Sequence, residues 1–160
     1  MSLYKYLLLF SFFFICCEKN NDIGKYLNSI VPQILAKICK SCKIKFVHIS
    51  TDHLFDGGKS FYEEIEIPNP VNVYAKSKYI GERNVLNINK ESLIIRTNFF
   101  GDGPKHKSSF SDTIINSLRD KKHISLFTDV FYTPIHIFEL VRACEKLVKE
   151  KHIGIYNIVS

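Results

Sequence analysis

The sequence has no tryptophan, a single methionine and no apolar run of the roughly 18 residues that a transmembrane helix requires. Its net charge of +6 comes from lysines that are spread along the chain and not gathered into a stripe with aromatic residues. No nucleic-acid partner is therefore expected. Internal repeats and low-complexity tracts are also absent, and 46% of the residues are hydrophobic. The chain should form an ordinary globular core.

The cysteines are few and irregularly spaced. The sequence has five of them: Cys16, Cys17, Cys39, Cys42 and Cys144. An odd number without regular spacing argues against a disulfide framework and indicates a reducing compartment, so we expect a cytoplasmic protein. Cys39 and Cys42 have the spacing of a redox or metal pair, but no second Cys or His pair completes a zinc site. No metal is expected.

Short apolar runs alternate with segments of helical periodicity. They predict strands at 44–49, 93–97, 124–127 and 155–159, and helices at 22–42, around 73–80, at 109–121 and at 136–151. This alternation is typical of a parallel α/β sheet. Pro32 should kink or divide the first helix. The helically spaced apolar residues of that helix predict the face that packs on the sheet: Ile23, Tyr26, Leu27, Ile30, Ile34, Leu35 and Ile38.

Residues 1–17 form a hydrophobic segment with more than one interpretation. The stretch from Tyr6 to Cys17 is almost entirely apolar, which is too short for a transmembrane helix but fits the core of a signal peptide. A lipoprotein signal with Cys16 or Cys17 as acceptor is another interpretation. Membrane contact or export is expected only if residues 3–17 act as such a signal or anchor. We favour a third interpretation, in which Phe10 to Ile15 form a strand of the sheet.

A hydroxyl group and a Tyr/Lys couple stand out in the middle of the chain. Thr51 follows the strand at 44–49, at the edge of the sheet where open α/β proteins bind ligands. Tyr74 and Lys78 are four residues apart in a helical segment, so their side chains share one face. Reduction of a ketone needs a proton donor, and a lysine about 4 Å away would lower the pKa of a tyrosine by roughly three units. Thr51 would hold the carbonyl oxygen while Tyr74 protonates it.

The order of the motifs is more specific than the Tyr/Lys spacing, which arises readily by chance in a lysine-rich chain. From about Cys17 to Ser160 the sequence resembles the extended short-chain dehydrogenase/reductases, and within them the dTDP-4-dehydrorhamnose reductases. The resemblance rests on Ser-Thr-Asp at 50–52, Asp-Gly at 56–57, Pro70 before Tyr74, Gly81-Glu82 after Lys78, and the segments at 62–64, 93–97, 129–134 and 154–157.

The resemblance implies a partial Rossmann-type, doubly wound parallel sheet with helices on both faces, formed by residues 18–160 with part of a small sugar-binding lobe. It implies reduction of a 4-keto-6-deoxy nucleotide sugar by NADPH or NADH, with a homodimer left open. The implied catalytic residues are Thr51, Tyr74 and Lys78. The cofactor would lie near Ser50, Tyr74, Lys78, Thr97 and Asn98, and the sugar near His53 and Phe99.

The chain also departs from the family pattern. Relatives usually carry tyrosine at the position of His53 and glycine at that of Ala75, so the sugar is open. None of the seven glycines has the G-x-x-G-x-x-G spacing of the turn that holds a cofactor pyrophosphate. The sequence therefore looks like a fragment or the product of a broken gene. Asn28 matches an asparagine near the family's active site, or is an ordinary polar helix residue.

A second function of a different class remains open. A non-catalytic relative of the same fold, like the regulatory beta subunit of methionine adenosyltransferase, binds a partner protein. The complete set of Thr51, Tyr74 and Lys78 favours the reductase, because a pure binding module has no need to keep all three. Fold alone decides neither function.

Overall fold

The centre of the molecule is a four-stranded parallel sheet with strand order β1-β2-β3-β6. The structure is a computed structural model, and it describes residues 6–7, 21–103, 108–130 and 132–160. The strands are β1 (Tyr6–Leu7), β2 (Lys45–Ile49), β3 (Leu93–Arg96) and β6 (Gly154–Asn157). All strands run in the same direction, so β2, β3 and β6 end at one edge of the sheet. The expected parallel α/β fold is confirmed.

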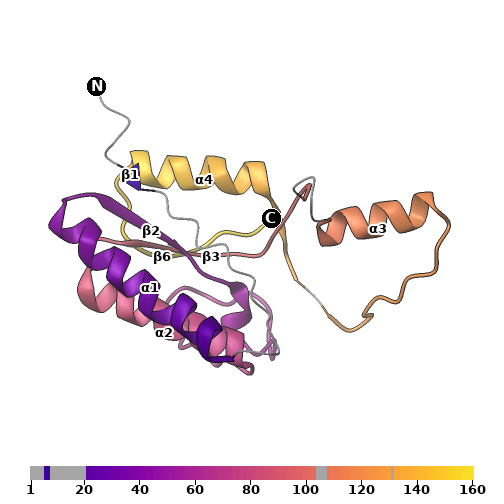
Figure 1. Cartoon of the computed structure of the whole chain (residues 1–160), viewed down its shortest axis with the longest axis horizontal. Coiled ribbons are helices and arrows are strands. Elements are labelled where there is room, and N and C mark those ends of the chain that lie inside the picture. The colour runs from indigo at the N-terminus through magenta and orange to yellow at the C-terminus, as the bar shows by residue number, and fades with distance from the viewer. Residues whose placement is uncertain (1–5, 8–20, 104–107, 131) are drawn as a thin grey trace.

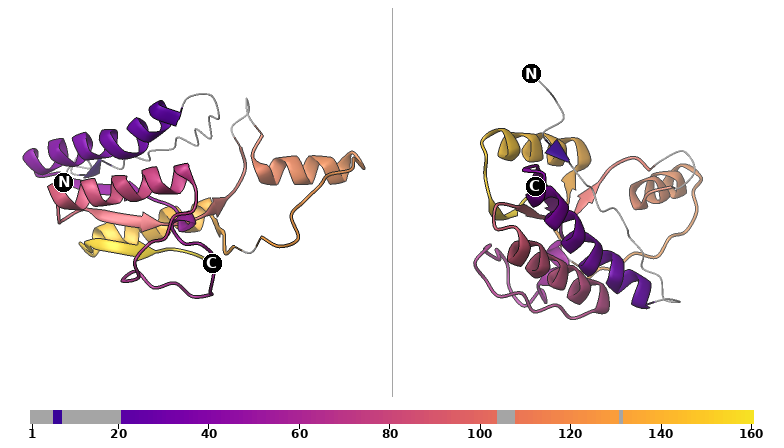
Figure 2. Two further views of the ribbon diagram at one scale, coloured as in Figure 1. Left: turned by 90° about the horizontal axis from the view of Figure 1, so that it is seen from below. Right: turned by 60° about the vertical axis from the view of Figure 1, so that its left-hand side comes forward.

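Helices cover both faces of this sheet (Figures 1 and 2). The helices α1 (Asn21–Ser41) and α2 (Val73–Ile88) lie side by side on one face, and α4 (Ile137–Lys149) lies on the other. Side chains of β2 alternate between the two cores: Phe46 packs with α1 and α2, and Val47 and Ile49 pack with α4. Burial on both faces explains why the central strands are almost continuously apolar.

The face of α1 that packs inward carries only part of the apolar set that the sequence suggested. Leu35 packs against the core as predicted, but for five of the seven residues the prediction is wrong. Five of the expected contact residues are 36% to 51% exposed: Ile23, Tyr26, Ile30, Ile34 and Ile38. The buried positions carry small or compact side chains: Asn28, Ser29, Pro32, Ala36 and Cys39. The cause is the close approach of α2, where a Cβ atom on Gly81 would lie 2.1 Å from the backbone oxygen of Asn28. Pro32 does not divide the helix.

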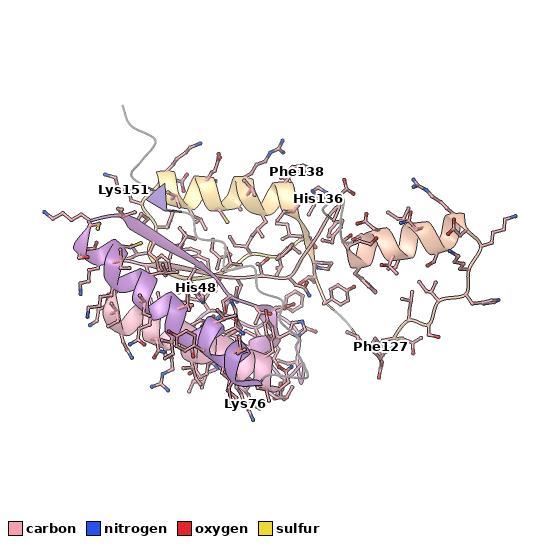
Figure 3. All side chains as sticks on the ribbon, viewed as in Figure 1. His48, Lys76, Phe127, His136, Phe138 and Lys151 are labelled. Atoms are coloured by element: carbon pink, nitrogen blue, oxygen red, sulfur yellow. The ribbon has the colours of Figure 1, made fainter. Side chains whose placement is uncertain are left out.

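The segment between β3 and α4 extends away from the sheet (Figure 1). It contains β4 (Phe99–Phe100), α3 (Phe110–Arg119) and β5 (Ile135–His136), and β4 pairs with β5. The strand predicted at 124–127 is wrong, because these residues form no regular structure and Phe127 is 84% exposed (Figure 3). No neighbouring strand in the described part of the chain supplies the backbone hydrogen bonds. The strand expected at Phe10 to Ile15 lies outside the described residues.

Candidate active site

The carboxyl end of β2 presents two buried hydroxyl groups. Ser50 continues the strand, and its backbone N–H donates to the oxygen of Ile95 at 2.6 Å. The Ser50 Oγ atom is buried and has no hydrogen-bond partner among the described residues. Thr51 caps the 3₁₀ turn η2 (Asp52–Leu54), where its Oγ1 accepts from the N–H of His53 at 3.2 Å. This cap fixes the Thr51 hydroxyl at the edge of the sheet.

Tyr74 lies in the first turn of α2 and reaches Thr51. The helix begins at the cap residue Asn72, whose Oδ1 accepts from the N–H of Ala75 at 2.8 Å. The Tyr74 hydroxyl forms a hydrogen bond with the Thr51 side chain. The ring of His53 meets the ring of Tyr74 edge-on, with the centroids 6.3 Å apart. Thr51, Tyr74 and His53, which the sequence placed in one site, therefore lie together.

The pKa of Tyr74 is raised. Burial is the main cause, the charge of Asp52 adds to it, and the hydrogen bond with Thr51 opposes it. The lowering that we expected from Lys78 is therefore not the net effect in this structure, because burial and the charge of Asp52 disfavour the phenolate more than the hydrogen bond with Thr51 favours it. Tyr74 consequently holds its proton at neutral pH, which is the form that a proton donor needs.

Lys78 lies one turn further along α2 and points at the sheet. Its side chain is buried, and its Nζ donates to the carbonyl oxygen of Ile49 at 2.6 Å. Burial lowers the pKa of Lys78 to about 8, and the charge of Glu82 opposes this lowering. The buried face of α2 thus carries Lys78, whereas Val73 and Ile80 are about half exposed.

Thr97, Asn98 and Phe99 follow the neighbouring strand β3. The pairing of Ile49 with Ile95 places them at the same edge of the sheet as Ser50 and Thr51, one strand away. Thr97 is buried, and the Asn98 carbonyl accepts from the N–H of Ile135 at 2.9 Å. Phe99 packs against the apolar core between β2, β3 and α4. Their position fits the expected site, and their part in binding a cofactor or a sugar stays a prediction.

Hydrogen bonds hold a loop at the same edge of the sheet, and they involve residues to which we assigned no role from the sequence. The Asp56 carboxylate accepts from the N–H of Gly58, from the Tyr62 hydroxyl at 2.7 Å and from the Asn69 amide at 2.9 Å. These hydrogen bonds lower the pKa of Asp56 to about 2. Asn157, the last residue of β6, donates its side-chain amide to the Tyr62 carbonyl. The Asp56-Gly57 motif was the signal for this loop.

An ion pair and a hydrogen bond between side chains lie next to the site. Glu82 of α2 and Arg96 of β3 form a buried ion pair, with Arg96 Nη2 and Glu82 Oε2 2.8 Å apart. The Asn28 amide donates to the Ser77 hydroxyl at 3.0 Å, so Asn28 joins α1 to the helix that carries Tyr74. Sequence reasoning missed this ion pair. The available signal was an arginine in a buried strand and a glutamate on the packed face of a helix.

The histidine in β2 is a core residue. His48 is 1% exposed, and Figure 3 shows it in the middle of the molecule. Burial, together with the charge of Lys78, holds its pKa well below the usual value, so the ring is neutral. In the described part of the chain, no group of three or more His, Cys, Asp or Glu side chains could hold a metal ion. No helix there is long and apolar enough to cross a membrane.

Comparison with known proteins agrees with the resemblance seen in the sequence. Residues 14–160 match the family model described as the RmlD substrate binding domain. The chain is 31% identical over 148 residues to a probable low-salt glycan biosynthesis reductase of Haloferax volcanii, covering 90% of this chain and 49% of that protein. It is 29% identical over 140 residues to the beta subunit of methionine adenosyltransferase 2 of Xenopus laevis, covering 84% and 41%.

A solved structure shares both fold and sequence with this chain. It is the dTDP-4-dehydrorhamnose reductase of Bacillus anthracis strain Ames in complex with NADP, with a TM-score of 0.82 and 28% identity. The match covers 89% of this chain and 50% of that one. The chain thus spans about half the length of the relatives that it matches. The predicted relationship to the dTDP-4-dehydrorhamnose reductases is confirmed.

Proposed function

Because this chain belongs to the RmlD substrate-binding domain family, we propose that it is the part of a reductase that carries the proton-donating site. The proposed reaction is reduction of the keto group of a 4-keto-6-deoxy sugar linked to a nucleotide. The observation that carries the proposal is the hydrogen bond between the Thr51 side chain and the Tyr74 hydroxyl, with the buried amine of Lys78 one helical turn away. These are the groups that such a reaction requires.

The residues at the carboxyl ends of β2 and β3 fit a nicotinamide dinucleotide, NADPH or NADH, which would supply the hydride. The buried Ser50 hydroxyl, which lacks a partner in the described residues, supports this fit because buried polar groups normally have one. We assign cofactor contacts to Ser50, Tyr74, Lys78, Thr97 and Asn98. His53, whose ring lies against Tyr74, and Phe99 would contact the sugar. The pyrophosphate is assigned to no residue, since the sequence lacks the G-x-x-G-x-x-G turn.

The proton chemistry follows from the geometry. A carbonyl oxygen that accepts from both Thr51 and Tyr74 is polarised by two hydroxyl groups in the edge position of an open sheet. Tyr74 transfers its phenolic proton to that oxygen as the negative charge develops on it. The raised pKa of Tyr74 makes the phenol a weaker acid, so the reaction depends on the Lys78 ammonium to stabilise the phenolate that is left. General acid catalysis of this type contributes about 10²–10⁴-fold to a rate.

The beta subunit of methionine adenosyltransferase supports a second candidate function, a binding subunit without turnover. The two candidates differ in one measurable property. A binding subunit would take up the dinucleotide or sugar nucleotide without converting it, whereas a reductase would oxidise the reduced dinucleotide when the keto sugar is added. Burial of Lys78 beside the helical turn of Tyr74 favours the reductase. Removing an amine from water costs free energy, and the reductase mechanism uses the buried amine whereas ligand binding alone does not require it.

The test joins this chain to the part of the Bacillus anthracis reductase that it does not cover. We expect this chimera to oxidise NADPH in the presence of a dTDP-linked 4-keto-6-deoxy sugar. Tyr74→Phe should lower kcat by at least about 100-fold while leaving dinucleotide affinity nearly intact. Tyr79→Phe, in the same helix, is the matched control and should retain activity. Binding of both ligands without turnover would support the binding subunit, and a Tyr74→Phe variant with more than about a tenth of the activity would exclude Tyr74 as the acid.

A further inference from the structure

Glu82 and Arg96 form a buried ion pair next to the proposed site. Glu82 is on the buried face of α2, one helical turn after Lys78, and is 2% exposed. Arg96 ends β3 and grips the carboxylate with two nitrogens, Nε at 3.1 Å from Oε1 and Nη2 at 2.8 Å from Oε2. The Glu82 carboxylate is therefore fixed in position by a two-point contact.

Lys78 is surrounded mostly by uncharged groups. Its amine donates to the Ile49 carbonyl of β2. The charge of Lys78 also lowers the pKa of His48, a neutral residue of the same strand. From its own helix, Glu82 supplies the negative charge that acts on it. From β3, Arg96 faces Glu82. A buried amine that meets only a carbonyl and a neutral ring loses its proton readily, because burial disfavours the charged form.

We propose that Glu82, clamped by Arg96, is a positioning residue that keeps Lys78 in the ammonium form inside the protein. The clamp also has a geometric effect. A free carboxylate four residues from Lys78 would form an ion pair with the amine directly, and would draw it away from the Ile49 carbonyl. Because Arg96 occupies both carboxylate oxygens, Lys78 keeps its place and Glu82 acts through space. The inference rests on the proposed function for its catalytic meaning only, since the electrostatic relation concerns this chain alone.

The spacing of Glu82 and Lys78 along the helix gives the approximate size of the pKa shift that the Glu82 charge causes in Lys78. The Cβ atoms of residues four apart on a helix are about 6 Å apart. Two unit charges about 6–10 Å apart change a pKa by roughly one to two units at an effective dielectric constant of about 20. Loss of the Glu82 charge would therefore lower the pKa of Lys78 from about 8 to about neutrality or below. At pH 7 at least about half of the Lys78 amines would then be neutral.

The test is an NMR titration of the 160-residue chain that carries ¹³C-labelled lysine, with the Lys78 signal assigned from its loss in Lys78→Arg. Glu82→Gln should lower the pKa of Lys78 by about one unit or more. Arg96→Met leaves the carboxylate free, so the pKa of Lys78 should stay at the wild-type value or rise. Both changes damage the same ion pair, so a merely structural role would shift the pKa in the same direction in both variants.

The controls separate folding from electrostatics. Glu139→Gln in α4 removes an exposed carboxylate that also pairs with an arginine, Arg142, at 2.7 Å, and should leave Lys78 unchanged. Glu82→Gln leaves Arg96 buried without its partner, which destabilises the fold. The double variant Glu82→Gln/Arg96→Met removes both charges and should also lower the pKa of Lys78. An unchanged pKa in Glu82→Gln or in the double variant, or a lowered pKa in Arg96→Met, would overturn the proposal. Failure of the chimera to turn over substrate would leave this result unaffected.

Discussion

Gly81→Ala tests the contact that sets the spacing between α1 and α2. Gly81 lies on the buried face of α2, and a Cβ atom there would lie 2.1 Å from the backbone oxygen of Asn28 and 3.3 Å from its carbonyl carbon. A carbon and an oxygen atom in contact are roughly 3.3 Å apart. The added methyl group therefore forces the helices apart by about 1 Å in the direction of this contact. The obstacle is backbone, which cannot rotate away as a flexible side chain can.

Two effects of opposite sign determine the stability of this variant. Alanine is favoured over glycine in a helix by about 0.5–1 kcal/mol. Overpacking a well-packed interface costs about 1–3 kcal/mol, and sometimes more. Moving the helices apart also stretches the 3.0 Å hydrogen bond between Asn28 and Ser77. We therefore expect Gly81→Ala to lower the free energy of unfolding by about 2 kcal/mol overall.

The measurement is urea unfolding of the 160-residue chain, followed by far-ultraviolet circular dichroism. Lys76→Ala is the control, because Lys76 points to solvent from the same helix (Figure 3). It should change stability by no more than about 0.5 kcal/mol. If Gly81→Ala were instead stabilised by the helix preference of alanine, α1 and α2 could not approach as closely as described, and the explanation for the small residues buried on α1 would fail with it.

Two other predictions concern buried ionisable groups. The pKa of Lys78 falls from 10.5 to about 8 on folding, so the unfolded chain binds more protons between these values and stability due to this group rises with pH. Relative to Lys78→Met, the wild type should gain roughly 3 kcal/mol from about pH 7 to pH 10.5, and equal slopes in the two unfolding curves would refute this. Burial raises the pKa of the Cys144 thiol to about 11, whereas Cys42 is exposed. Iodoacetamide at about pH 8 should therefore modify Cys42 and spare Cys144 until the chain unfolds, and early labelling of Cys144 by peptide mass analysis would contradict its burial.

The positions of most elements follow from local patterns. The runs that form β2, β3 and β6, and the helical spacing of α1, α3 and α4, were all read from the sequence to within a few residues. These patterns are local, since β-branched runs and apolar periodicity act over a few neighbouring residues. The segment at 124–127 has the same local pattern as a strand, yet it lacks a partner in the described chain, and a strand requires hydrogen bonds to a neighbour.

The prediction of the buried face of α1 failed for a different reason. Hydrophobicity pointed to Ile30 and Ile34, but the helix buries Ala36 and Cys39 instead. Side-chain size at a helix contact depends on how closely the partner helix approaches, and Gly81, which allows the close approach, is more than 40 residues away in the sequence. A periodic pattern gives the period of a helix and says little about the distance to its neighbour.

The sequence by itself determined the strand-end threonine Thr51, the placement of Tyr74 and Lys78 on one helix, and the family to which the chain belongs, because these depend on the order of residues along the chain. Only the tertiary structure decided that Thr51 and Tyr74 share a hydrogen bond, that Lys78 points at the Ile49 carbonyl, and that Glu82 is clamped by Arg96. It also reversed the expected sign of the Tyr74 pKa shift. The physical reason is that desolvation depends on everything packed around a group, so the charge state of a buried side chain is a property of the whole fold.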